Sequence, residues 1–219
     1  TERLRECSPA SNVVTVPNGV DLDYFKPQQQ TRNGKRLIFV GTMNWYPNIE
    51  AVMYIADHVW PALKARHADL EIDIIGANPP DTVKNLAQRL PGFHVHGFVD
   101  DVRPYIDAAA VYVCPIRDGG GTKLKILDAM AMAKAIVAHP IACEGITVSN
   151  GSNISFAETP DAFIKAVDDL LRDPETAQAM GARARELMQS TYGYHSIGQK
   201  FADLLQDCVR ERRNNACAE

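Results

Sequence analysis

One stretch of the chain combines the residue types that bind anions. An apolar, β-branched run at 111–116 predicts a strand, and three glycines at 119–121 follow it. A helix is predicted to begin at Thr122, where Thr122, Lys125 and Asp128 are spaced three apart and share one face. The free backbone N–H groups at a helix N-terminus attract anions. The stretch therefore predicts a site for a ligand built of phosphate and sugar.

A purely structural interpretation of the same stretch stays open. Glycine-rich turns often serve only to connect a strand to a helix, and Lys and Asp side chains near a helix start are usually solvated. The spacing matches neither the Walker A pattern GxxxxGK[ST] nor the dinucleotide pattern GxGxxG. On the other face of the predicted helix, the apolar residues Leu124, Leu127 and Ala131 are expected to enter a core.

Composition narrows the class of protein. The 219 residues are 46% hydrophobic and 23% charged, which is ordinary for a soluble globular chain of one large domain. The net charge of −4 gives no reason to expect a nucleic-acid partner. No apolar run approaches the roughly 18 residues of a membrane span, and we expect neither a transmembrane segment nor a signal peptide. Five cysteines without a CxxC pair predict free thiols in a reducing, cytoplasmic compartment.

Strands and helices are predicted to alternate along the chain. The expected strands lie at 13–16, 36–40, 70–75, 93–99, 111–115, 135–138 and 153–157. Helices are expected at 48–64, 80–90, 101–109 and directly after the glycine run. Two more are expected to begin after the N-caps Thr159 and Asp173, and a last one at about 194–211. The last helix is expected to bury Ile197, Phe201, Leu204 and Leu205. This alternation predicts an α/β fold, a doubly wound, Rossmann-like parallel sheet with helices on both faces and a helical C-terminal tail.

The predicted organisation divides the chain into three parts. Residues 1–35 are expected to be a linker with one short strand, 36–192 the Rossmann-like domain, and 193–219 a helix with a frayed tail from 212 onward. Ligands of doubly wound sheets bind beyond the carboxyl ends of the strands. The residues expected at those ends are Gly41-Thr42, Gly76-Ala77, Val99-Asp100 and Gly119–Gly121.

An ordered set of motifs resembles the group 1 glycosyltransferases. The motifs are Val16–Asp21, Phe39–Gly41, Ile75-Gly76, Gly97–Val99, Pro115, Gly119–Thr122 and Leu127–Ala131. More narrowly, residues 13–210 are similar to the C-terminal, nucleotide-sugar-binding half of a retaining family 4 enzyme with the GT-B fold. The resemblance implies that the acceptor-binding half and the catalytic histidine lie before residue 1, and that this half is inactive alone. It also implies that the last helix crosses back to the N-terminal half, so that residues 194–211 expose an apolar stripe in this chain.

The resemblance also implies roles for individual residues. The family pattern has two glutamates separated by seven residues, and the second falls on Asp128, which would bind the ribose hydroxyls. The first, which usually touches the donor sugar, falls on Gly120. Thr42 and Asn48 stand in the region where relatives place an arginine and a lysine that clamp the diphosphate. Lys125 is therefore our candidate for the missing cation, and Lys123 is second.

The expected site has three groups of residues. The donor phosphates are assigned to Gly41, Thr42, Gly120, Gly121, Thr122, Lys123 and Lys125. The ribose and base are assigned to Gly76, Val99, Leu127 and Asp128, and donor-sugar contacts to Arg117, Gly119 and Glu144. The resemblance implies no metal and no cofactor besides the substrate, a UDP- or GDP-sugar. The expected partners are that donor, the chain's own N-terminal acceptor-binding domain and an acceptor glycan or lipid-linked glycan, with peripheral contact at the inner face of the cell membrane.

Several other residues have two interpretations. His94 and His96 alternate on one strand as two metal ligands would, but no third ligand is spaced nearby. Asp100-Asp101 resembles a catalytic pair, and Asp101 also suits the cap of the helix that follows. Trp45 and Tyr46 line a pocket or pack at a helix entry. A nucleotide-sugar 2-epimerase of the same fold and a catalytically inactive sugar-nucleotide-binding module remain as alternative functions.

Overall fold

The computed structural model describes residue 6, residues 13–28 and residues 35–216, with side chains up to residue 210. Its centre is a six-stranded, wholly parallel sheet in the order β3-β2-β1-β4-β5-β6. The strands are β1 Arg36–Val40, β2 Glu71–Ile75, β3 Phe93–Gly97, β4 Val111–Cys114, β5 Ala135–Ala138 and β6 Ser155–Phe156. This order is that of a doubly wound, Rossmann-like sheet, which confirms the predicted fold class.

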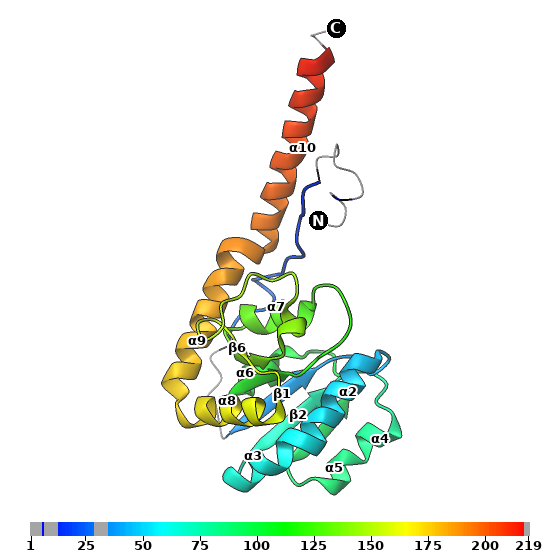
Figure 1. Ribbon diagram of the computed structural model, residues 1–219, viewed down its shortest axis with the longest axis vertical. Helices are drawn as coiled ribbons and strands as arrows, with labels where there is room; N and C mark the ends of the chain where they lie inside the picture. Colours follow the sequence, from blue (N-terminus) through cyan, green and yellow to red (C-terminus); the bar gives the residue numbers. More distant parts are fainter. Residues whose placement is uncertain (1–5, 7–12, 29–34, 217–219) are drawn as a thin grey trace.

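Helices follow the strands and cover the sheet (Figure 1). They are α2 Tyr46–Tyr54, the π-helix η1 Ile55–Val59, α3 Trp60–Arg66, α4 Asp81–Lys84, α5 Leu86–Arg89, α6 Arg103–Ala108, α7 Leu124–Ala131, the 3-10 helix η2 Pro140–Cys143, α8 Pro160–Arg172, α9 Pro174–Leu187, the π-helix η3 Met188–Tyr192 and α10 Tyr194–Ala216. Helix α8 packs against α3 and η1, while α9 packs against α7 and β5. Figure 1 shows α10 extending as one long helix beyond the α/β body.

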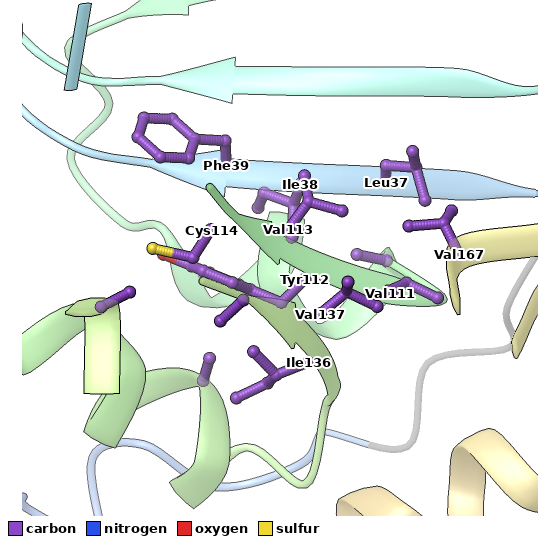
Figure 2. Packing of buried hydrophobic residues seen from close by; sticks show 14 of the residues in the cluster. Leu37, Ile38, Phe39, Val111, Tyr112, Val113, Cys114, Ile136, Val137 and Val167 are labelled. Atoms are coloured by element: carbon purple, nitrogen blue, oxygen red, sulfur yellow. The ribbon is translucent and has the colours of Figure 1, made fainter. Parts of the chain in front are cut away.

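The core lies between the central strands and the helices. Strands β4 and β5 are buried along their whole length, as expected for parallel strands covered on both faces. Figure 2 shows side chains of β1, among them Leu37 and Phe39, beside Tyr112 of β4 and Val167 of α8. Because these strands are rigid and fully packed, the loops at their carboxyl ends have fixed starting points.

Two predicted helices are interrupted. The helix expected at 48–64 contains the π-helical turn η1 directly before the Trp60-Pro61 pair. Pro61 has no N–H to donate to the preceding turn, and a wider turn accommodates its ring. The helix expected at 80–90 is two short helices, α4 and α5, that meet at Asn85.

The predictions for the two ends of the chain were partly wrong. Residues 13–16 do not form the expected strand, and Val20 further along forms an isolated bridge with Gly193. Helix α10 continues to Ala216, beyond the predicted start of fraying, because no glycine or proline follows Gly198. Phe201 and Leu205 on that helix are about half exposed rather than buried. The predictions for residues 1–5, 7–12, 29–34 and 217–219 lie outside the described residues.

Two further sequence predictions concern cysteines and membranes. The described cysteines, Cys114, Cys143 and Cys208, are all free thiols. Among the described helices, none has both the length and the apolar character needed to cross a bilayer.

Candidate functional site

The site lies where the strand order changes direction, beyond the carboxyl ends of β1 and β4. These two strands are neighbours at the point where the strand order reverses. Ligands of doubly wound sheets bind between the loops that follow two such strands, and this region is called the crevice below. Gly41 is the first residue of the loop after β1, and the glycine run 119–121 lies in the loop after β4. A hydrogen bond from Lys125 to Asn48 joins the two loops' helices across the crevice.

Lys123 organises the glycine loop from inside. Its side chain is 5% exposed, and its Nζ donates hydrogen bonds to the carbonyl oxygens of Gly119 at 2.5 Å and Gly121 at 2.9 Å. Gly119 and Gly121 have φ angles of +91° and +82°, which residues other than glycine rarely adopt. Gly120 has no such restriction, and a Cβ atom there would meet no atom within 4 Å. The loop is therefore rigidly held, with open space at Gly120.

The predicted common face of Thr122, Lys125 and Asp128 was wrong for Thr122. Helix α7 begins at Leu124, because Gly121 has a positive φ and Lys123 an extended backbone that no helix continues. Thr122 instead faces the next loop, where a Cβ on Gly145 would lie 2.8 Å from its hydroxyl.

The apolar face predicted for the same helix is also shorter than expected. Leu124 is 52% exposed, whereas Leu127 and Ala131 are fully buried. From the sequence, Leu127 is assigned to the ribose or base. Because its side chain lies in the core, only its backbone is available for that contact.

Lys125 reaches the carboxyl end of β1. Its Nζ donates to Asn48 Oδ1 at 2.5 Å and lies 4.9 Å from the centre of the Phe39 ring. Burial lowers the pKa of this ammonium group, because the charged form loses hydration and its hydrogen-bond partner is a neutral amide. A Cβ on Gly41 would lie 2.5 Å from the same nitrogen. The positive charge is thus held directly against the end of β1.

Asp128 lies one turn further along α7 and is partly buried. Burial raises the pKa of its carboxyl group from 3.8 to about 7. No nearby cation contributes to this shift, so ionisation of the carboxyl group is unfavourable. Hydroxyl groups of a ligand would stabilise the ionised form by donating hydrogen bonds to it.

The remaining strand ends meet at the same edge. A Cβ on Gly76 would lie 1.8 Å from the carbonyl oxygen of Gly41, so the backbones after β1 and β2 are in direct contact. The Gly76 N–H donates to the Gly97 carbonyl at 2.8 Å, which ties in the end of β3. Val99, in the loop after β3, is partly buried. The structure thus brings the residues assigned to ribose and base to one edge of the sheet.

The residues assigned to the donor sugar are less concentrated. The Arg117 guanidinium stacks on the Tyr54 ring of α2, with 4.6 Å between its central carbon and the ring centre. Glu144 is exposed and precedes Gly145, which lies beside Thr122. Arg117 is thus directed along α2, whereas the Glu144 loop borders the glycine run.

Helix α2 contributes contacts that the sequence only partly suggested. A Cβ on Gly119 would lie 2.5 Å from the Trp45 ring, and the Tyr46 hydroxyl donates to Asp118. Trp45 and Tyr46 therefore pack on the glycine loop. Asn48 was noted only as a replacement for a lysine, and its role as partner of Lys125 was missed. No local sequence signal points to this pairing, because Asn48 and Lys125 lie 77 positions apart.

Two other candidate sites have structural partners. His96 Nε2 lies 2.7 Å from Asp73, and His94 Nε2 lies 3.7 Å from Glu71. Within the described ranges, no group of three or more His, Cys, Asp or Glu side chains is arranged to hold a metal ion. Asp101 accepts a hydrogen bond from the Arg103 N–H at 2.9 Å, at the first residue of α6. The N-cap residue of α6 is Val102, so Asp101 stands one residue before the cap position, although its carboxylate does accept from the first N–H of the helix.

Comparison with curated proteins identifies relatives of known activity. A phosphatidyl-myo-inositol mannosyltransferase of Mycolicibacterium smegmatis is 28% identical over 186 residues, covering 80% of this chain and 47% of that protein. A GDP-mannose-dependent alpha-(1-6)-phosphatidylinositol monomannoside mannosyltransferase of the same organism is 28% identical over 220 residues, covering 90% and 57%. The chain spans about half the length of these curated relatives.

Solved structures share the fold. A sucrose-phosphate synthase from Thermosynechococcus elongatus superposes with a TM-score of 0.76 at 18% identity, covering 96% of this chain and 56% of that one. The C-terminal domain of a group 1 glycosyl transferase from Francisella tularensis superposes with a TM-score of 0.66 at 18% identity, covering 80% of this chain and all of that one. The family model described as "Glycosyl transferases group 1" matches residues 34–173, more than half of the sequence. The chain belongs to the group 1 glycosyltransferases and has the Rossmann-like fold of these structures.

Proposed function

We propose that this chain is the donor-binding part of a retaining glycosyltransferase that transfers a sugar from a nucleotide diphosphate to a glycan or lipid-linked glycan. The observation that carries the proposal is the charge at the crevice. Lys123 and Lys125 have neutral oxygen atoms as hydrogen-bond partners, and in the described part of the chain neither forms an ion pair with a carboxylate. Two such ammonium groups favour an anionic ligand such as a diphosphate.

The proposed roles follow from where the groups lie. Lys125 and the backbone around Gly41 and Gly121 bind the diphosphate, and Asp128 accepts hydrogen bonds from the ribose. In the reaction the sugar–phosphate bond breaks and negative charge grows on the diphosphate. Fixed cations and N–H groups stabilise that charge, and each such donor typically contributes about 3 kcal/mol to the transition state. We propose that no metal and no cofactor besides the nucleotide sugar is needed.

The acceptor and its binding domain are part of the same proposal. The curated relatives are about twice as long as the matched region. We therefore assign acceptor binding to a second domain in the complete protein. Phe201, Leu205 and Val209 form an exposed apolar stripe at four-residue spacing on α10, which is the surface we assign to contact with that domain. We place the complete protein in the cytoplasm, in peripheral contact with the membrane that carries the acceptor.

Gly120 favours a second candidate, a binding module without catalysis. The glutamate that usually touches the donor sugar is absent there, although open space surrounds the position. In a module of this kind the nucleotide would bind tightly while no sugar is transferred.

The binding roles are tested by calorimetric titration of UDP and GDP. The wild-type chain should bind one of them with at least tenfold higher affinity than Asp128→Ala or Lys125→Ala. Equal affinities in all three proteins would refute the roles of both residues. A complete protein that binds the nucleotide but releases no diphosphate from any mixed donor sugar would favour the binding module.

A further inference from the structure

Asn48 is a polar side chain buried at the start of α2. It is 2% exposed, and both of its polar atoms are used. Its Nδ2 donates to the carbonyl oxygen of Thr42 at 2.6 Å, and its Oδ1 accepts from Lys125 Nζ at 2.5 Å. The orientation of the amide is determined by its partners, because a carbonyl oxygen only accepts and a lysine ammonium only donates.

Other side chains at this position would lose one of the two bonds or change the charge. An aspartate has no donor for the Thr42 carbonyl, and a lysine has no acceptor for Lys125. A carboxylate would in addition neutralise the ammonium group. The amide therefore holds Lys125 without cancelling its charge.

A second buried lysine shows the contrast. Lys134 Nζ donates to the Asp107 carbonyl at 2.5 Å and also lies 3.9 Å from the Asp107 carboxylate. A carboxylate near a buried ammonium offsets part of the cost of desolvating its charge. At Lys125 the nearest partners are an amide oxygen and the face of Phe39, so its charge stays available to a ligand.

The pair also fits the end of β1 closely. A Cβ on Gly41 would lie 2.5 Å from Lys125 Nζ and 2.7 Å from Asn48 Cγ. The Gly41 N–H is meanwhile bonded to the Ile75 carbonyl at 2.8 Å, which fixes the backbone against which the pair rests. The absence of a side chain at Gly41 allows both side chains to lie in the mouth of the crevice.

We propose that Asn48 is a positioning residue that directs the Lys125 ammonium group at the diphosphate of the donor. The proposal rests on the function proposed above and deepens it. In this chain the cation that binds the diphosphate is supplied by α7, after β4, and an uncharged residue of α2, after β1, holds it in place. Loss of Asn48 should therefore act on ligand binding only through Lys125.

The first test is a double-mutant cycle read by calorimetry, using UDP or GDP, whichever binds more tightly, and the corresponding monophosphate. Asn48→Ala and Lys125→Met should each weaken diphosphate binding by about tenfold to a hundredfold, because a hydrogen bond to a charged group is lost. The double variant should bind no more weakly than Lys125→Met alone. The preference for diphosphate over monophosphate should shrink in all three. Asn153→Ala, which removes another asparagine acceptor, should bind as the wild type does.

The second test needs no ligand. Amine labelling followed by peptide mass spectrometry should show Lys125 reacting several times faster in Asn48→Ala than in the wild type, while the exposed Lys165 reacts equally in both. Unchanged labelling of Lys125, or full additivity in the double variant, would overturn the role of Asn48 and leave the proposed function standing. If the wild-type chain binds neither nucleotide, the proposed function itself fails, whatever the labelling shows.

Discussion

Replacement of Asp128 by Asn should stabilise the protein in a pH-dependent way. The wild-type carboxyl group has its pKa raised by burial from 3.8 to about 7, whereas an unfolded chain keeps the ordinary value. Between these values the folded state holds a proton that the unfolded state has released. The free energy of unfolding of the wild type therefore falls as the pH rises from about 4 to about 7, and Asp128→Asn lacks this loss.

The magnitude follows from the size of the pKa difference. At about 1.4 kcal/mol per pH unit, the interval from 3.8 to about 7 corresponds to about 4 kcal/mol. The side chain is partly exposed, so water relaxes around the charge and reduces the effect, and we expect about 2–4 kcal/mol. The advantage of Asp128→Asn should be near zero at pH 4, grow up to pH 7 and stay constant above it.

Urea denaturation of both proteins across pH 4.5–8 measures this advantage. Asp101→Asn is the matched control, because hydrogen bonds from Arg103 lower the pKa of Asp101. That carboxylate contributes stability that is present above pH 4 and lost only in more acidic solution, so the difference in stability between wild type and Asp101→Asn should not change between pH 5 and 7. Stability curves for wild type and Asp128→Asn that run parallel over this range would refute the buried-carboxylate account.

Three further predictions concern the same crevice. Gly76→Ala should destabilise the protein by about 3 kcal/mol or more in denaturant titration, because the added Cβ would lie 1.8 Å from the Gly41 carbonyl oxygen. Gly120→Ala should be within about 0.5 kcal/mol of the wild type, because a Cβ at that position meets no atom within 4 Å. Gly120→Glu should fold with an unchanged melting temperature and change the ranking of donor sugars in binding competition; a melting temperature lowered by more than about 5 °C would contradict the open space. Nucleotide binding at pH 6.5 should release protons as Asp128 ionises, detected by calorimetry in buffers of different ionisation enthalpy. Asp128→Asn should release fewer protons, leaving only those from the terminal phosphate of the nucleotide.

Local sequence patterns were sufficient for most of the fold. Strands β1 and β5 have the predicted boundaries, because continuous apolar, β-branched runs suit strands buried on both faces. The helix starts at Thr159 and Asp173 were also predicted, and both side chains accept the expected hydrogen bonds, from Ala162 and Thr176. Each of these signals lies within a few residues of the structure it specifies.

The site required the tertiary structure. Helical spacing predicted that Lys125 and Asp128 lie on one face of the same helix. The order of the motifs suggested that this helix begins near the carboxyl ends of the other strands. The bond between Lys125 and Asn48 joins residues 77 positions apart, and the burial of Asp128 depends on segments packed around α7. Periodicity describes only which way a side chain points from its own element. Which group it meets, and how much water remains around it, is decided by how the strands pair and bring distant loops to one edge of the sheet.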